Sequence, residues 1–264
     1  MSKPFQTLVR KLLPLFCLFL VIVSAQAQKG QDNYHTLLSA QLMEAVKAQK
    51  KTASLQAELA EVEAARLNQA LQTDAQKKAF WINVYNAYIQ LILREEPNLY
   101  EDRSDFFSEP RFTVAGKKLS FDDVEHGIIR SSELKLALGL IKNPFADDFE
   151  KQFRTVKTDA RIHFALNCGA ASCPPVAILY AASIDEQLDG LSKSFLEQSS
   201  NYFPKKNQIE VSKLFSWFRG DFGGSDGTLA FLKKYGIIAE TDHPSISYAD
   251  YDWNLKLDYY AQDQ

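Results

Sequence analysis

The feature of the sequence that most restricts the fold is an apolar segment, residues 79–93, which reads AFWINVYNAYIQLIL. Nearly every position from Phe80 to Leu93 is apolar, which is typical of a helix that other parts of the protein surround. We expect this helix to begin near Asp74, a good capping residue, and to end before Pro97. The sequence therefore predicts one buried helix against which much of the protein packs.

Three amide side chains interrupt this segment on one side of the helix. At 100° per residue, Asn83, Asn86 and Gln90 lie within about 60° of one another and form a narrow polar stripe. A buried amide without hydrogen-bond partners costs roughly a few kcal/mol, so each of them needs partners. The stripe predicts either bonds to neighbouring loops or amides that orient a catalytic side chain or a substrate. The sequence leaves both interpretations open.

A hairpin and a second helix follow. The segment FTVAGKKLSF predicts a hairpin that turns at Ala115 and Gly116. Ser120 and Asp123 then have the spacing of a reciprocal helix cap.

In this second helix an acidic residue falls on the apolar face. Glu125 lies within the arc of Val124, Ile128 and Ile129, and His126 lies at its edge. A carboxylate there needs a cation, a histidine or hydrogen-bond donors. Glu125 is therefore either satisfied by nearby helix ends and loops or part of a functional pair.

The segment 161–175, RIHFALNCGAASCPP, carries the residue types of a reactive site. Its first part alternates apolar and other residues, which predicts a strand with Arg161 and His163 on one face. Asn167 and Cys168 would end the strand, and the small residues after them favour a loop that leaves backbone N–H groups pointing into a common space. A histidine and a cysteine five positions apart suggest chemistry, although a lone histidine in a strand is more often a core residue.

Four interpretations compete for this region. In a thiol hydrolase or acyl transferase, Cys168 is the nucleophile, His163 its base, and Glu125 or Asn86 orients the imidazole. Cys173 is the alternative nucleophile. The remaining candidates would contact the substrate; they are Asn83, His126, Arg161, Asn167 and Cys173.

The other three interpretations need no catalytic thiol. A Cys168–Cys173 disulfide fits a spacer of four residues, and in an exported protein such a bridge is common. A zinc site is disfavoured because the spacing fits no usual metal signature, and we expect no metal and no cofactor. The last interpretation is a non-catalytic module that binds an unknown small-molecule or peptide ligand.

The first 27 residues predict export. Lys3, Arg10 and Lys11 precede an apolar run from Leu12 to Val23, and the residues AQA end at position 27 as a signal-peptidase site would. The run is short for a membrane span, so no stable span is expected after the signal is removed. We expect a protein of the periplasm or the extracellular space.

Beyond the predicted signal peptide, residues 28–73 predict a helical N-terminal arm, which offers a surface for a protein partner. The chain carries 30 Lys and Arg residues against 33 Asp and Glu residues, and removal of the signal makes this balance more acidic. Nucleic-acid binding by phosphate neutralisation is therefore not expected.

The C-terminal third predicts strands at residues 207–215 and 245–257, with helices between them. Arg219 and Asp221 are interpreted as a surface ion pair, and Tyr248, Tyr251 and Trp253 as core aromatics.

Five segments in order make the chain resemble the bacterial and plant family catalogued as domain of unknown function 547. They are AFWINVYNAYIQLIL, FDDVEHGIIR, IHFALNCGAASCPP, VSKLFSWFRGDFG and YADYDWNL. The likeness spans roughly Asp74 to Leu257. Upstream, AVKAQKKTASL stands where the family usually has a turn that contains glycine and ends in tyrosine. The resemblance implies an α+β domain, commonly exported in bacteria, with no established activity; a coiled-coil segment in plant relatives suggests interaction roles.

Together these observations predict an α+β fold with a mostly antiparallel sheet packed with helices, and a domain over residues 74–264. We expect Glu125, His163 and the amide stripe to converge beside the Cys168 loop. The leading functional hypothesis is a thiol-dependent hydrolase or acyl transferase acting on peptide or amide substrates of the cell envelope. The alternative is a non-catalytic binding or interaction module with a structural Cys168–Cys173 disulfide.

Overall fold

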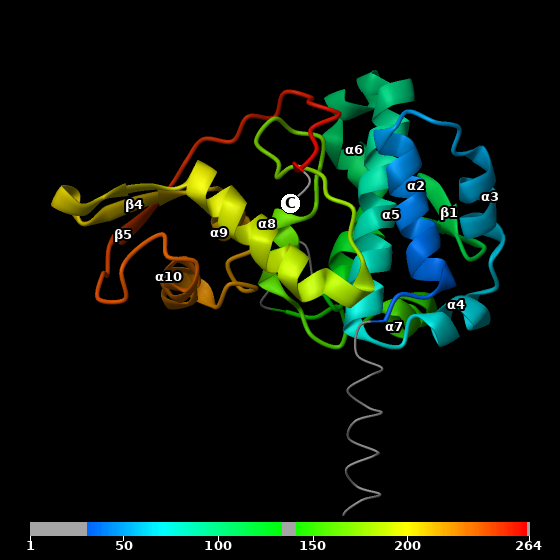
Figure 1. Cartoon of the computed structure of the whole chain (residues 1–264), viewed down its shortest axis with the longest axis horizontal. Helices are drawn as coiled ribbons and strands as arrows, with labels where there is room; N and C mark the ends of the chain where they lie inside the picture. The colour runs from blue at the N-terminus through cyan, green and yellow to red at the C-terminus, as the bar shows by residue number, and fades with distance from the viewer. Residues whose placement is uncertain (1–30, 134–140, 263–264) are drawn as a thin grey trace, which may run out of the picture.

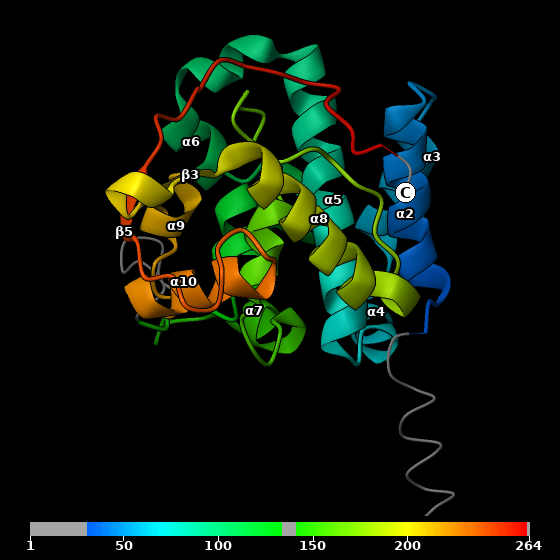
Figure 2. The same cartoon turned by 60° about the vertical axis from the view of Figure 1, so that its left-hand side comes forward.

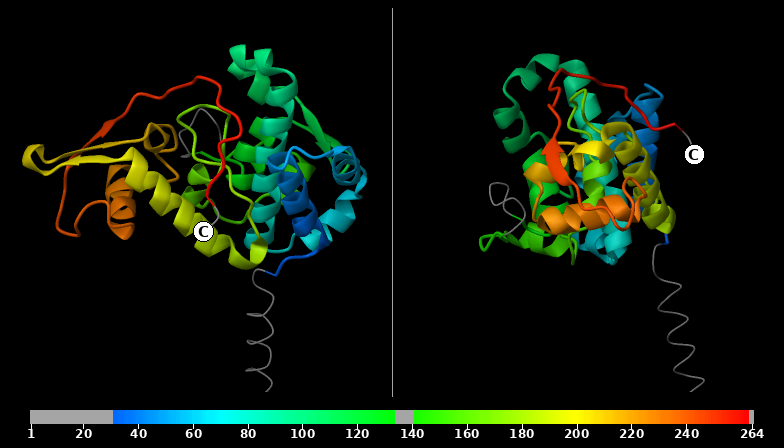
Figure 3. Two further views of the ribbon diagram at one scale, coloured as in Figure 1. Left: turned by 45° about the horizontal axis from the view of Figure 1, so that its top comes forward. Right: turned by 90° about the vertical axis from the view of Figure 1, so that its left-hand side faces the viewer.

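The computed structural model describes residues 31–133 and 141–262. The predicted signal peptide, residues 1–27, lies outside the described residues. Two clusters of buried apolar side chains organise the rest, a large one around helix α5 (Asp74–Glu95) and a smaller one formed by the C-terminal third. In Figure 1 and the left view of Figure 3, helices α2 and α5 lie on one side of α8, and the strands β4 and β5 lie on the other.

Helix α5 is the buried helix that the sequence predicts. Its residues from Lys78 to Gln90 are all buried, and it ends at Glu95, just before Pro97. The capping residue is Thr73, one residue earlier than expected. The Thr73 hydroxyl group accepts a hydrogen bond from the backbone N–H of Gln76, and the side-chain oxygen of Gln76 accepts one from the backbone N–H of Thr73. The Asp74 carboxylate instead accepts two backbone N–H groups of the loop at residues 156–157.

The N-terminal region forms three helices rather than a continuous one. They are α2 (Tyr34–Lys47), α3 (Ala53–Glu61) and α4 (Ala64–Ala70). The chain turns after α2 at Gln49, which has a left-handed φ of 51°. Leu42 and Met43 of α2, Leu59 of α3 and Leu67 of α4 are fully buried against the α5 cluster. This region is therefore part of the main core.

The middle of the chain is made of short elements. The hairpin has the expected turn: β1 (Phe112–Val114) and β2 (Lys117–Leu119) pair antiparallel, and Ala115 and Gly116 both have positive φ. The reciprocal cap of Ser120 and Asp123 is also confirmed. The helix behind it, η2 (Asp123–Ile129), has wide π-type turns. The other elements of this region are η1 (Pro97–Glu101), α6 (Arg103–Ser108) and α7 (Asp148–Phe153).

The predicted strand at the start of the 161–175 segment is wrong. Residues Ala160–Phe164 form a 3₁₀ helix, η4, whose first turn is capped by Asp159 through the backbone N–H of Arg161. Ile162 packs into the α5 cluster and Phe164 into the C-terminal cluster. In a 3₁₀ helix, residues two apart point in different directions. The alternating apolar pattern therefore reflects two separate cores and not one face of a sheet.

The C-terminal third combines helices with a small sheet. Its elements are η5 (Ala181–Ser183), α8 (Ile184–Ser199), β3 (Asn201–Phe203), η6 (Pro204–Lys206), β4 (Gln208–Val211), α9 (Leu214–Trp217), α10 (Gly224–Lys234) and β5 (Ser245–Tyr248). Strand β4 is central, antiparallel to β3 and parallel to β5. The protein is thus an α+β protein, as predicted, with small sheets.

The predicted last strand ends early, at Tyr248, and the chain continues as an extended segment. Figure 2 shows this segment running back from β5 toward α2. On its way Lys256 donates its backbone N–H to Gly169, and Asn254 accepts from Ala171. Near its end, Lys47 of α2 lies over the ring of Tyr260. The segment 249–262 therefore joins the two halves of the protein. Within residues 31–133 and 141–262, no helix is both long and apolar enough to cross a bilayer.

Candidate functional site

A cavity of about 490 Å³ lies where η2, the loop after η4, α9 and the extended segment 249–262 meet. Much of its wall is aromatic and comes from Tyr85, Phe107, Trp217, Phe218, Tyr251 and Trp253. Its polar side chains are Arg103, Ser104, Asp122, Glu125, His126 and His163. The two cysteines also line it. Of the predicted site residues, the cavity brings together Glu125, His126, His163, Cys168 and Cys173, which are far apart in the sequence.

The two cysteines form a disulfide. Cys168 and Cys173 are bonded, with their Cα atoms 6.3 Å apart. Gly169 allows the tight loop between them, because its φ is +85° and a Cβ there would come within 3.1 Å of a Leu93 methyl group. A bonded sulfur has no thiolate form, so the predicted Cys168 nucleophile is not present in this structure, and neither is the alternative at Cys173.

The His163 ring is directed at a carboxylate, not at a sulfur. Its Nε2 atom lies 2.7 Å from Oδ2 of Asp221, and both side chains are 1% exposed. The ring stacks on Phe218, with centroids 3.7 Å apart. Asp221 thus has the orienting role that the sequence assigned to Glu125 or Asn86. The predicted surface pair of Arg219 and Asp221 is wrong, since Asp221 is buried and Arg219 contacts Ser225.

Asp221 also receives two hydrogen bonds from a buried arginine. The Nε and Nη2 atoms of Arg130 lie 2.7 and 2.9 Å from its two carboxylate oxygens. Burial opposes the charge on Asp221, but the bonds from His163 and Arg130 outweigh it and lower its pKa to about 2. Burial lowers the pKa of His163. A neutral His163 therefore donates from Nε2 to an ionised Asp221, which fixes the tautomer with Nδ1 unprotonated.

The network continues to a second histidine. Nη1 of Arg130 lies 2.7 Å from Nδ1 of His126, and because a guanidinium group only donates, this nitrogen accepts. The other ring nitrogen of His126 lies 3.5 Å from Asp122. His163, Asp221, Arg130, His126 and Asp122 thus form one connected row along the cavity. The row fixes the orientation of the two imidazole rings that line the cavity, those of His126 and His163.

Glu125 stands next to this row with few partners. Its carboxylate accepts a hydrogen bond from the hydroxyl group of Tyr85, 3.1 Å away. Burial, followed by the charge on Glu125, raises the pKa of Tyr85 well above its ordinary value, so Tyr85 remains a donor. Among the residues that the structure describes, Glu125 makes no ion pair. A carboxylate in an aromatic cavity is thus available to a ligand.

The predicted amide stripe is buried and has a structural role. Asn86 donates to the carbonyl of Ala165 and accepts from the N–H of Asn167, at 2.8 and 2.9 Å. Asn83 likewise donates to the carbonyl of Leu179 and accepts from the backbone N–H of the same residue. Gln90 accepts from the N–H of Asp258. These amides therefore hold three non-helical segments against α5. The predicted catalytic role of Asn86 and the substrate contact of Asn83 are not supported.

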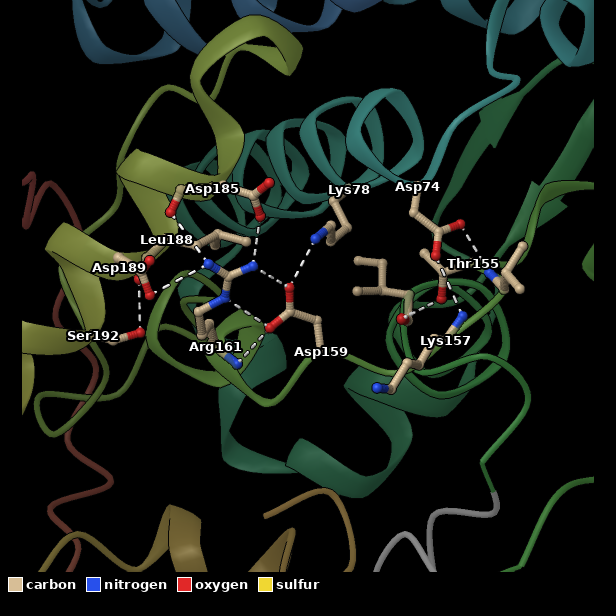
Figure 4. Close-up of polar contacts among 12 residues, drawn as sticks. Asp74, Lys78, Thr155, Lys157, Asp159, Arg161, Asp185, Leu188, Asp189 and Ser192 are labelled. Atoms are coloured by element: carbon tan, nitrogen blue, oxygen red, sulfur yellow. Dashed lines mark hydrogen bonds and ion pairs between the residues drawn. The ribbon is translucent and has the colours of Figure 1, made fainter. Parts of the chain in front are cut away.

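Two further predicted substrate contacts are structural. Asn167 donates to the carbonyl of Pro174 and accepts from the N–H of Gly169, so it braces the disulfide loop. Arg161 forms ion pairs with Asp159, Asp185 and Asp189, as Figure 4 shows.

In the same cluster Asp159 also pairs with Lys78 of α5 at 2.7 Å. Burial opposes the charge on Asp159, but hydrogen bonds from Arg161 and Lys78 hold its pKa far below the ordinary range. This cluster ties η4 and α8 to α5, and neither Arg161 nor Asn167 lines the cavity.

The aromatic wall was missed, because its residues were interpreted as core packing. The ring of Tyr251 lies 4.7 Å from Trp217 and 4.6 Å from Trp253, measured between centroids, and Arg103 lies over the Trp253 ring at 5.0 Å. The sequence does contain a pattern that indicates this wall, because Tyr251 and Trp253 alternate with Asp250 and Asp252. This pattern places two aromatic rings on one face of an extended segment.

The fold and the site define an α+β domain in which a disulfide-bonded loop, a buried His–Asp–Arg row and aromatic side chains enclose a cavity. Residues 69–196 match the model of the family described as "Protein of unknown function, DUF547", so this part of the chain is a DUF547 domain, as the resemblance indicated. Asp221 and the wall residues Trp217, Tyr251 and Trp253 lie beyond the matched segment. Searches of the curated proteins and of the solved structures gave no match.

A metal site was the least favoured of the four interpretations. Among the described residues, no group of three or more His, Cys, Asp and Glu side chains is placed to hold a metal ion.

Proposed function

We propose that this protein is a binding module that takes a small zwitterionic ligand with an aromatic or apolar body into the cavity. The observation that carries the proposal is the composition of the cavity wall. Glu125 and Arg103, which carry charges of opposite sign, line a cavity of about 490 Å³ together with six aromatic side chains. A further carboxylate in the wall, that of Asp122, lies 3.5 Å from His126. Ligand cavities of this size are typically apolar, with a few polar groups that orient the ligand.

The two charges indicate the chemistry of the ligand. Among the described residues, neither Glu125 nor Arg103 has an oppositely charged partner; Arg103 instead contacts the rings of Tyr100 and Trp253. A ligand amino group would pair with Glu125 and a ligand carboxylate with Arg103, and charge-assisted hydrogen bonds of this kind are stronger than neutral ones. The aromatic rings suit a flat or apolar body. Amino acids and short peptides with an aromatic side chain combine these features.

The disulfide argues for binding over a thiol-dependent hydrolase or acyl transferase. An enzyme that used Cys168 as its nucleophile would require the bridge to be open. The binding module does not require the bridge to open. We therefore propose the binding module as the function and not the thiol-dependent hydrolase.

Tryptophan fluorescence tests the proposal, because Trp217 and Trp253 line the cavity. The full chain is titrated with the dipeptide Phe-Phe, its N-acetylated form and its C-terminal amide. We expect the free dipeptide to bind. Each blocked form should bind at least about tenfold more weakly than the free dipeptide, because each loses one charged contact. Equal affinity for all three forms, or no response to any of them, would contradict the proposal.

Variants assign each charge to its contact. Glu125→Gln should abolish the discrimination between the free and the acetylated dipeptide, and Arg103→Met the discrimination between the acid and the amide. Glu240→Gln is the matched control, because Glu240 is exposed and does not line the cavity. Glu240→Gln should bind all three peptides as the parent protein does.

Export also remains our proposal. A disulfide in a protein of this size fits an oxidising compartment, the periplasm or the extracellular space, where paired thiols stay bonded. Expression of the full chain in a bacterial host tests it: the mature protein should be recovered from the periplasm or medium with its N-terminus near Gln28. Recovery of only the uncleaved chain from the cytoplasm would contradict export.

A further inference from the structure

One sulfur of the disulfide is held by two hydrogen-bond donors. The nitrogen of the Cys168 backbone N–H lies 3.1 Å from Sγ of Cys173. The hydroxyl oxygen of Tyr251 lies 3.2 Å from the same sulfur and 3.5 Å from Sγ of Cys168, so it is nearer to Cys173. A disulfide sulfur carries no hydrogen, so Tyr251 is the donor in this contact. Burial raises the pKa of Tyr251, so its hydroxyl group keeps its proton. Such donors bond only weakly to a disulfide sulfur but much more strongly to a thiolate.

The two cysteine residues also differ in exposure. Cys173 is 3% exposed, whereas Cys168 is only half-buried, and both residues line the cavity. We therefore infer that a thiolate that enters the cavity attacks the more exposed residue, Cys168. Attack on Cys168 makes Cys173 the leaving group, and this is the sulfur that the two donors would stabilise as an anion.

The loop that carries the bridge is fixed independently of it. Ala171 and Ser172 donate their backbone N–H groups to Asn254 and Asp252, and Gly169 accepts from Lys256. Asn167 braces the base of the loop from the other side. The two cysteines therefore have little freedom to move apart after reduction, and the bridge can close again within the folded protein.

From these contacts we propose that the Cys168–Cys173 bridge is redox-active and accepts two electrons from a small dithiol that enters the cavity. A thiolate of the dithiol attacks Sγ of Cys168, the S–S bond breaks, and its electron pair leaves on Cys173 as a thiolate held by Tyr251 and the N–H of Cys168. The second thiol of the reductant then attacks the mixed disulfide and releases Cys168. The dithiol becomes a disulfide, and its two protons end on the two cysteines. This proposal does not depend on the ligand proposed above.

The test measures reduction of the native full chain by dithiothreitol, with iodoacetamide trapping and mass spectrometry, and with circular dichroism to monitor folding. We expect the bridge to open while the circular dichroism spectrum remains that of the folded protein. With glutathione, which forms a mixed disulfide, peptide mapping should place the adduct on Cys168. Reduction that occurs only in denaturant, or an adduct on Cys173, would overturn the proposal.

Tyr251→Phe keeps the aromatic ring and removes only the donor. Its reduction should be slower than that of the parent protein, on the order of tenfold, as the loss of one hydrogen bond to a charged group predicts. Tyr248→Phe is the matched control, because Tyr248 is 38% exposed and lies outside the cavity. An unchanged rate in a folded Tyr251→Phe variant would contradict the assigned role of the hydroxyl group.

Discussion

Nε2 of His163 lies 2.7 Å from Oδ2 of Asp221, a residue 58 positions later in the chain. Arg130 donates two hydrogen bonds to the same carboxylate, one to each oxygen. The carboxylate therefore joins three distant segments, namely η4, η2 and the loop after α9, at the wall of one cavity. A buried charge with this many partners is costly to disturb, because removal of one member leaves another charge uncompensated.

Asp221→Asn tests this network. The substitution leaves the Arg130 guanidinium buried without a counter-charge, and we expect the free energy of unfolding to fall by about 3–5 kcal/mol. Urea denaturation of the purified protein measures the change. Asp250→Asn, at an exposed position, is the control and should change it by less than about 0.5 kcal/mol. A similar small effect of Asp221→Asn would show that the buried pair is unimportant for folding.

The pH dependence of stability has a defined direction. The pKa of Asp221 is lowered to about 2 in the folded protein, so its contribution is present above the ordinary aspartate pKa and is lost as the pH falls toward 2. The pKa of His163 is lowered by burial, so below about pH 6.5 the unfolded chain takes up a proton that the folded protein does not. Both effects reduce stability on acidification.

Urea denaturation at a series of pH values from 8 to 3 measures these two losses of stability, the one from His163 and the one from Asp221. In Asp221→Asn the step below pH 4 should be smaller than in the parent protein, because that carboxylate no longer titrates. An unfolding free energy of the parent protein that rises as the pH falls from 7 to 4 would contradict the expected loss of stability in acid.

Asn86→Ala tests the structural role of the amide stripe. The substitution leaves the buried carbonyl of Ala165 and the N–H of Asn167 without their partner, and we expect a loss of roughly 2–5 kcal/mol. Asn98→Ala, at an exposed position, is the control. Differential scanning calorimetry or urea denaturation provides the measurement. An Asn86→Ala protein as stable as the Asn98→Ala protein would show that these bonds contribute little.

The double variant with Cys168→Ser and Cys173→Ser tests the bridge. Because the bridge closes a short loop, the chain-entropy relation predicts a loss of only about 2 kcal/mol. The variant should therefore remain folded, and it should retain the cavity. In the parent protein, iodoacetamide should label neither Cys168 nor Cys173 without reductant. Labelling of either cysteine in the untreated native protein would mean that the sulfurs are free. That result would favour the hypothesis of a thiol-dependent hydrolase.

Local signals allowed much of the fold to be predicted. The apolar run of α5, the turn at Ala115 and Gly116, the reciprocal cap of Ser120 and Asp123, and strand β4 all follow from residues close together in the sequence. The buried amide stripe was also predicted from periodicity alone. The backbone groups to which these amides bond were not predicted, because they belong to segments 79 to 168 positions away in the sequence.

The site was predicted less completely, for a physical reason. Arg219 is the nearest cation to Asp221 in the sequence, but the actual partner is Arg130, 91 positions earlier. Only tertiary packing brings these residues together, and no local pattern encodes it. The same holds for η4, where the alternation of Ile162 and Phe164 is typical of a strand but arises from contacts with two different cores.

The extended segment 249–262 supplies Tyr251 and Trp253 to the cavity wall, and it hydrogen-bonds to the loop at residues 169–171. A chain without this segment still contains the α5 core and the disulfide loop, but its cavity lacks the part of the wall that Tyr251 and Trp253 form. The proposed ligand site therefore depends on residues that follow the last strand, and we expect a chain shortened before residue 249 to lose binding of the dipeptide.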